Sequence, residues 1–107
     1  MTALPGTAFK ILTAAEWAGF QADGWFEGSP VDRADGFIHL SAADQVEATL
    51  ARHFAGQAGL VLIEVDLGAL GGAVRWEESR GGALFPHAYA VLPLSAVVGA
   101  ASVSGQA

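Results

Sequence analysis

Seven consecutive residues, Leu60–Asp66 (LVLIEVD), carry apolar side chains almost without interruption. A short run of this kind, rich in branched residues, is typical of a strand that is covered on both faces. We therefore expect Leu60–Asp66 to be a central strand of a sheet. The chain has 107 residues, which is enough for one hydrophobic core and too few for two domains. We expect a single domain over residues 1–107, compact from about 8 to 100, with a loose C-terminal tail.

The other patterns predict more strands than helices. Further strands are expected at residues 9–12, 37–41, 74–77, 85–92 and 96–100, and a short extended piece at 25–26 inside a loop that spans 21–36. Because Pro86 has no N–H, it should restrict its segment to a strand start or a sheet edge. No regular alternation of strand and helix runs through the chain. This pattern favours an α+β fold with a mixed or antiparallel sheet.

Two helices are expected. The first begins after Thr13, which with Glu16 fits a capping box, and ends near Gly24. The second runs from Ser41, as N-cap, to about Gly56. Its apolar residues recur every four positions, which predicts a buried stripe; they are Val46, Leu50 and Phe54.

Composition excludes several classes of function. The formal net charge is −6, with one lysine and four arginines, so we expect no attraction of the whole surface to nucleic acid. No apolar run is long enough to cross a membrane, and the first six residues show no secretory signal. The absence of cysteine excludes thiolate metal sites, and the histidine spacing predicts no metal site. We expect a cytoplasmic protein, and its high apolar content suits a homo-oligomer.

Two histidines in apolar surroundings are the main candidates for chemistry. His39 lies in the middle of GFIHLS, and His87 lies in FPHAY. For either histidine alone, a half-buried ring bonded to backbone is the simpler interpretation. Their neighbours favour a site, because Ser41 shares a strand face with His39 and Tyr89 shares one with His87. We predict that the two histidines face each other within about 10 Å, the reach of two side chains to one ligand. We also expect His39 to lie near the positive N-terminus of the following helix, which suits an anion.

The segment WEESRGG, residues 76–82, adds groups that suit a ligand site. Glu77 and Glu78 offer carboxylates, Ser79 offers a hydroxyl, and Arg80 would hold a phosphate or carboxylate. An ordinary turn is the competing interpretation. Trp25 would stack on a ligand ring or cover the core. Asp32, Arg33 and Asp35 would be charges at the edge of the site, but a solvated turn is the preferred interpretation. The catalytic candidates are His39, His87 and Glu77, and the ligand-binding candidates are Ser41, Arg80, Ser79, Trp76, Tyr89 and Trp25.

Four blocks of the sequence resemble a known family. DGFIHLS, LIEVD, RWEESRGG and FPHAY are similar to segments of the bacterial and plant domain-of-unknown-function family nine-five-two, over about residues 9–98. The resemblance implies a fold like that of the ADP-ribosyltransferases and RNA 2′-phosphotransferases, a split and curved mixed sheet around a cleft with about two helices. It also implies NAD or an ADP-ribose-like group as ligand. Lys10 on the first strand and His39 on the next would stand at positions that such transferases use. Glu77 or Glu78 would be a loose match to their late glutamate, and Glu77 would act as a base or stabilise an oxocarbenium-like state.

Three functions stay open at this point. The first is an ADP-ribosyltransferase-like enzyme or binder with a histidine-lined cleft for a nucleotide. The second is a two-histidine phosphoesterase, since His39-Leu40-Ser41 is an H-x-S strand, although the second copy reads His87-Ala88-Tyr89. The third is a non-catalytic module that binds a small molecule or a partner protein.

Overall fold

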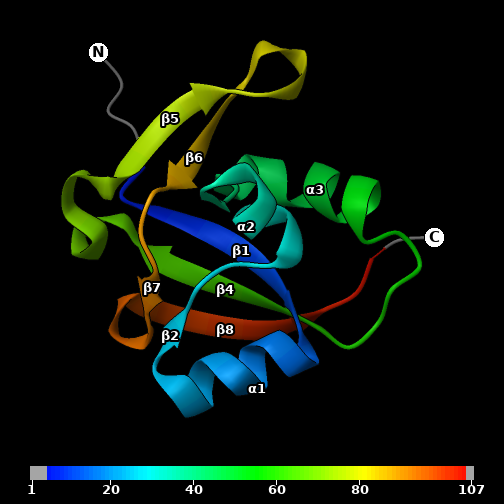
Figure 1. Cartoon of the computed structure of the whole chain (residues 1–107). Coiled ribbons are helices and arrows are strands. Elements are labelled where there is room, and N and C mark those ends of the chain that lie inside the picture. The colour runs from blue at the N-terminus through cyan, green and yellow to red at the C-terminus, as the bar shows by residue number, and fades with distance from the viewer. Residues whose placement is uncertain (1–4, 106–107) are drawn as a thin grey trace.

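Strand β4 (Leu60–Asp66) is the middle strand of a three-stranded antiparallel sheet, between β1 (Thr7–Thr13) and β8 (Val97–Val103) (Figure 1). The computed structural model describes residues 5–105, apart from the side chain of Arg80. The predicted central position of Leu60–Asp66 is confirmed. The last strand extends to Val103, so part of the tail that was expected to be loose is paired with β4.

A second three-stranded sheet carries the two candidate histidines. Its middle strand is β6 (Leu84–Ala88), which pairs with β3 (Ile38–His39) on one side and with β5 (Val74–Glu78) on the other. A small third sheet joins β2 (Trp25–Phe26) to β7 (Leu92–Pro93). Every strand pair among residues 5–105 is antiparallel, so the α+β class is confirmed in its antiparallel form.

The two larger sheets meet at one bridge. The N–H of Phe9 donates to the carbonyl of Ser41 at 2.7 Å, and the N–H of Ser41 donates to the carbonyl of Phe9 at 2.8 Å. The N–H of Leu40 donates to the carbonyl of Pro86 at 3.0 Å. The segment from Ile38 to Ser41 therefore passes from β6 to β1 and ties the histidine-bearing sheet to the β4 sheet.

The expected position of Pro86 is wrong. It lies within β6, which is the middle strand of its sheet and not an edge, and it is buried. Proline lacks only the donor, and its carbonyl still accepts the hydrogen bond from Leu40. A middle strand therefore tolerates this proline because the acceptor side of the residue is used.

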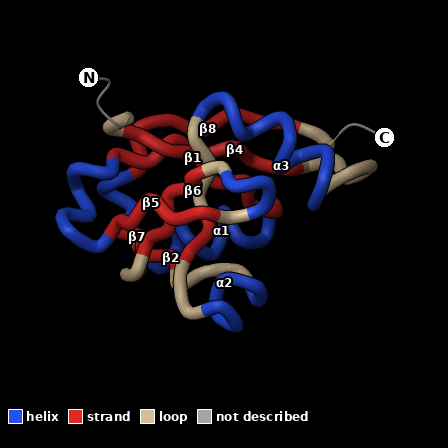
Figure 2. The backbone as a smooth tube through the Cα atoms, turned by 90° about the horizontal axis from the view of Figure 1, so that it is seen from above, coloured by secondary structure: helices blue, strands red, loops and turns tan. Residues whose placement is uncertain are grey.

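Three α-helices are present within residues 5–105: α1 (Ala14–Asp23), α2 (Pro30–Asp35) and α3 (Val46–His53). The capping box at Thr13 and Glu16 is confirmed, and Gly24 ends α1 in the left-handed conformation. Four short 3₁₀ segments also occur, η1 (Ala43–Gln45), η2 (Leu67–Ala73), η3 (Arg80–Gly82) and η4 (Leu94–Ala96). Viewed from above, α2 and α3 lie on different sides of the molecule, with α3 beside the β4 sheet (Figure 2).

Helix α2 corrects the expectation of a loop over 21–36. The signal was present in the sequence, because Ser29 and Asp32 form a second capping box and Pro30 occupies the first turn. The N–H of Ser29 donates to Asp32 Oδ2 at 2.9 Å, and the N–H of Asp32 donates to Ser29 Oγ at 3.3 Å. These contacts start a short helix in a segment whose glycine content favoured a loop.

The start of α3 also differs from the expectation. Ser41 is not its N-cap, because the turn η1 intervenes and the N–H of Ala42 donates to Gln45 Oε1 at 2.9 Å. The Ser41 hydroxyl lies 3.0 Å from the Thr49 hydroxyl. The predicted stripe of Val46, Leu50 and Phe54 is only half-buried, and no residue of α3 is fully buried.

One cluster of buried apolar side chains forms the core. It draws on β1, α1, β4, β6 and the segments around β2 and β7, and its fully buried members include Leu12, Phe20, Ile63, Val65 and Leu92. The Phe20 and Phe26 rings are stacked, with centroids 5.6 Å apart. Within the described residues, helices are too short or too polar for a membrane span.

A substitution in the core tests whether β4 is its central strand. Ile63→Ala should destabilise the protein by roughly 2–5 kcal/mol, because it removes buried methyl groups and leaves a cavity. The matched change Val98→Ala, at an exposed position of β8, should cost less than about 1 kcal/mol. Urea unfolding followed by tryptophan fluorescence measures both. Equal losses would show that β4 is not central to the core.

Candidate functional site

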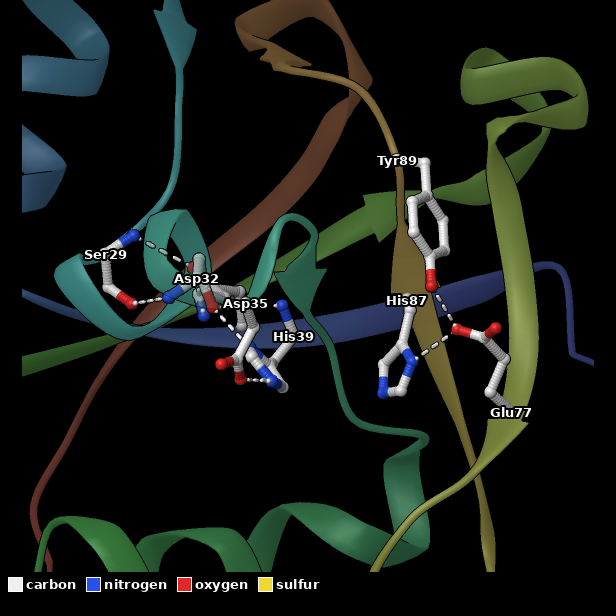
Figure 3. A network of polar contacts seen from close by, with 8 residues as sticks. Ser29, Asp32, Asp35, His39, Glu77, His87 and Tyr89 are labelled. Carbon is white, nitrogen blue, oxygen red and sulfur yellow. Dashed lines mark hydrogen bonds and ion pairs between the residues drawn. The ribbon is translucent and has the colours of Figure 1, made fainter.

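The pairing of β3 with β6 places His39 directly opposite His87. Their ring centroids are 5.6 Å apart, and the ring planes are inclined by 70° (Figure 3). The His39 side chain is 35% exposed, so it is not sealed in the core. The predicted proximity of the two histidines is therefore confirmed. It follows from one register, because adjacent antiparallel residues that face each other point to the same side.

Both ring nitrogens of His39 contact carboxylates. Nδ1 lies 2.6 Å from Asp32 Oδ1, and Nε2 lies 3.0 Å from Asp35 Oδ2. Only the imidazolium form has a proton on each nitrogen, so this geometry suits a charged ring that donates twice. The expected helix N-terminus beside His39 is wrong, because α2 instead brings two acidic side chains to the ring.

Asp32 is buried, with 2% of its surface exposed, and it ion-pairs with Lys10 of β1 at 2.9 Å. Burial by itself would raise the pKa of the Asp32 carboxyl. The charge and hydrogen bond of Lys10, together with the hydrogen bonds from His39 and the Ser29 N–H, outweigh burial and lower this pKa below the usual value. The expectation that Asp32 lies in a solvated turn is wrong, and its capping-box spacing to Ser29 was the signal that could have found it.

Among the described residues, one ring nitrogen of His87 has a hydrogen-bond partner. His87 is 5% exposed, and its Nδ1 lies 2.8 Å from Glu77 Oε1 on β5. A donor at Nδ1 leaves the Nε2 lone pair free in the neutral ring. Among the described residues no buried side-chain nitrogen or oxygen lacks a partner, and none contacts this Nε2. Figure 3 shows Nε2 at the end of the ring turned away from Glu77, on the side of His39.

Glu77 also accepts a hydrogen bond from Tyr89. The Tyr89 hydroxyl donates to the same Oε1 atom at 2.6 Å. This bond, together with the bond from His87, lowers the pKa of the Glu77 carboxyl. The Glu77 carboxylate in turn raises the pKa of the Tyr89 phenol. The three residues form a chain, Tyr89–Glu77–His87, whose carboxylate is ionised at neutral pH.

Phe37 is a member of the site that the sequence did not single out. Its ring stacks on His87, with centroids 4.2 Å apart, and also meets His39 at 4.6 Å and Tyr89 at 5.3 Å. The alternation of residues 37 and 39 on one strand face was the available signal. Arg75 pairs with His87 across β5 and β6, and its Cζ lies 5.1 Å from the Tyr89 ring centroid.

The remaining candidates lie elsewhere. Trp76 packs against the core, opposite in the strand alternation to Glu77, and Ser79 is exposed at the tip of the β5–β6 hairpin. Ser41 is buried against Thr49. The side chain of Arg80 lies outside the part of the chain that the structure describes. Of the nine candidates, the structure brings together His39, His87, Glu77 and Tyr89.

Two hollows in the described surface, of about 250 and 290 Å³, lie away from the histidine pair, and neither is lined by His39 or His87. Trp25, 53% exposed, lines the first hollow between α1 and α2, and the second lies between α3 and the β4 sheet. Within the described residues, acidic and histidine side chains form no group of three arranged to hold a metal ion.

The chain has one tyrosine, so the Tyr89–Glu77 contact can be tested by ultraviolet titration of the phenol. The pKa of Tyr89 should lie above the ordinary 10.0, because ionisation places a phenolate beside the Glu77 carboxylate. Glu77→Gln should bring the midpoint back towards 10.0. Glu78→Gln removes a carboxylate from the next position of β5 and should leave the midpoint unchanged. Identical midpoints in the native protein and Glu77→Gln would contradict the contact.

Comparison with known proteins confirms the family that the sequence resembles. The model of the family described as "Protein of unknown function (DUF952)" matches residues 11–100. The crystal structure of protein CC0527 from Caulobacter crescentus is 53% identical, with a TM-score of 0.86, over 90% of this chain and 84% of that one. The solution NMR structure of CC0527 is 51% identical, with a TM-score of 0.82, over 94% and 86%. No curated protein matches the chain. The chain belongs to the DUF952 family.

Proposed function

We propose that the face formed by β3, β5 and β6 binds a ribonucleotide and transfers protons on it, with His87 as general base and His39 as general acid. The free Nε2 of His87, held by Glu77 through Nδ1 and turned towards His39, is the observation that carries this proposal. A neutral imidazole is suited to accept a proton near neutral pH.

Glu77 has a defined part in the base half of the pair. When His87 accepts a proton at Nε2, the new positive charge lies 2.8 Å from the ionised Glu77 carboxylate. The carboxylate stabilises that charge and keeps Nδ1 protonated, so the lone pair stays at Nε2. Tyr89 supports Glu77 from the other side. A ribose hydroxyl or a water molecule is the group that such a base would activate.

His39 supplies the acid half. Asp32 fixes the ring through Nδ1, and Nε2–H points to Asp35, whose side chain is 48% exposed. An exposed carboxylate can turn away into water at little cost. An oxygen of the ligand, such as a phosphate oxygen or a leaving alkoxide, would then take the proton of Nε2–H.

A nucleotide fits the chemistry around this pair. Tyr89 presents a half-exposed ring on which a base can stack, and Arg75 beside it offers a cation for phosphate. The site also contains the carboxyl groups of Asp35 and Glu77, which favour a reaction in which positive charge develops on the sugar. ADP-ribose and NAD each carry a base that can stack, phosphate groups and a sugar at which such charge can develop. NAD is the cofactor of this proposal.

The fold adds support of a different kind. The two main sheets share a single bridge at Phe9 and Ser41, and His39 lies next to this junction. A sheet split in this way agrees with the relationship to the ADP-ribosyltransferase fold that the sequence suggests. Likeness of fold alone does not establish a reaction, so the histidine pair carries the proposal.

Phosphodiester hydrolysis is the second candidate. Two histidines that face each other at 5.6 Å are the pair needed to deprotonate a nucleophile and protonate a leaving oxygen. A 2′,3′-cyclic nucleotide is the matching substrate. The Ser41 hydroxyl, however, lies against Thr49, and Tyr89 bonds to Glu77, so neither hydroxyl faces the gap between the rings.

The experiment is an NMR titration of the protein with NAD, ADP-ribose and a 2′,3′-cyclic nucleotide, each followed for turnover. Shifts should cluster on residues 36–45 and 76–89. His87→Ala should weaken binding by about tenfold, as for a lost hydrogen bond to a charged ligand, and slow any turnover by roughly a hundredfold or more.

His53→Ala is the matched control, because this exposed histidine of α3 lies outside the pair. It should bind and turn over each nucleotide as the native protein does. Binding without turnover of any of the three would leave a non-catalytic nucleotide-binding module. No shifts in a folded protein at millimolar nucleotide would overturn the proposed function.

A further inference from the structure

The Asp32 carboxylate has all of its acceptor positions in use. Oδ1 accepts from the backbone N–H of His39 at 3.1 Å and from its Nδ1–H at 2.6 Å. Oδ2 accepts from the N–H of Ser29 and from Lys10 Nζ, each at 2.9 Å. A carboxylate has about four lone-pair positions, so none remains for a ligand. Asp32 therefore cannot act on a ligand directly.

A capping role explains only part of this arrangement. The capping box of α2 needs the Ser29 contacts, whereas the buried ion pair with Lys10 and the two bonds to His39 lie outside it. Burying a charged pair costs desolvation free energy that its mutual attraction often does no more than offset. Stability alone is therefore a poor reason for a lysine that is 10% exposed next to a carboxylate that is 2% exposed.

The backbone at Gly28 lies close against the Asp32 side chain. Gly28 has a φ of +113°, and a Cβ at this position would lie 2.8 Å from the Asp32 Cβ. A side chain at residue 28 would therefore displace Asp32, and Ile38 of β3 is also 3.5 Å from that Cβ position. By contrast, a Cβ at Gly36, which ends α2, would meet nothing within 4 Å.

The two bonds to His39 determine how its ring lies. A ring nitrogen and the backbone N–H of the same residue bind one oxygen atom, which fixes both side-chain torsions of His39. Nδ1 must then point inward, and Nε2 must point outward to the exposed side of the site (Figure 3). We infer that Asp32, with Lys10 as its counter-charge, is a positioning residue that fixes the His39 ring with Nε2–H presented to the ligand.

The effect of this role on a ligand rests on the proposed function. The orientation of the His39 ring can be measured without a nucleotide. Histidine ring ¹⁵N–¹H spectra report which nitrogen carries a proton and how fast that proton exchanges. In the native protein, His39 should show a proton on Nδ1 that exchanges slowly. In Asp32→Asn, that proton should exchange at least tenfold faster, because an amide is a weaker acceptor than a carboxylate.

Ser29→Ala is the control that separates positioning from capping. It removes the hydroxyl that accepts from the Asp32 N–H, yet it leaves both bonds from His39 to Asp32 in place. The His39 ring signals should therefore stay as in the native protein. Equal changes in Ser29→Ala and Asp32→Asn would assign the effect to the helix cap and overturn the inference.

Two outcomes would also overturn it directly. One is a native His39 without a slowly exchanging proton on Nδ1, a result that needs no variant and holds even if Asp32→Asn does not fold. The other is an unchanged exchange rate in a folded Asp32→Asn. A failure of all nucleotides to bind would overturn the proposed function and leave the ring result standing, so the two failures are distinguishable.

Discussion

The pairing of two residues, Ile38 and His39, with β6 is the constraint on which the site depends. It places His39 against His87, and the same segment goes on to bridge Phe9 of β1 at Ser41. The histidine-bearing sheet is thus joined to the main core by backbone hydrogen bonds within four residues of His39. A slip of one residue in this register would turn His39 to the opposite face, since side chains alternate along a strand.

Two carboxylate–histidine units meet at this register, and they differ in burial. Asp32 is inside the protein and lies against Lys10, so its charge is compensated and its contact with His39 is shielded from water. Glu77 is on the partly exposed side and relies on Tyr89 and His87. Each carboxylate contacts Nδ1 of its histidine, and Nε2 of His39 has a further contact with the exposed Asp35. This difference in hydrogen bonding is the basis on which we propose opposite roles in proton transfer for the two neighbouring imidazoles.

Much of the fold was predictable where local signals were strong. The apolar run of β4, the capping box at Thr13 and the pair Trp25–Phe26 all have local causes, and each lies where the pattern indicated. The histidine pairing was also within reach, because His39 and His87 lie in similar apolar runs that suit neighbouring strands. Helix α2 was missed because the glycines and proline of residues 21–36 outweighed a capping box over Ser29 and Asp32 that was present in the sequence. The position of Pro86 in a middle strand was missed because proline, which lacks an N–H, usually avoids such strands. The sequence does not show that only the carbonyl of Pro86 is used in pairing with Leu40.

The contacts between the site residues were less predictable than the strands that carry them. A strand pattern states which side chains share a face, and this placed Tyr89 with His87. It does not state which distant element comes to lie against that face. Asp32 reaches His39 only because α2 folds back over β1, and Lys10 stabilises it there from a strand more than twenty residues earlier in the sequence. An acidic residue in a segment with several acids gives no local sign that it will be buried. What distinguishes Asp32 from its neighbours is the lysine opposite, a tertiary contact, and that contact is why a residue that looked like solvated surface controls the orientation of the central histidine.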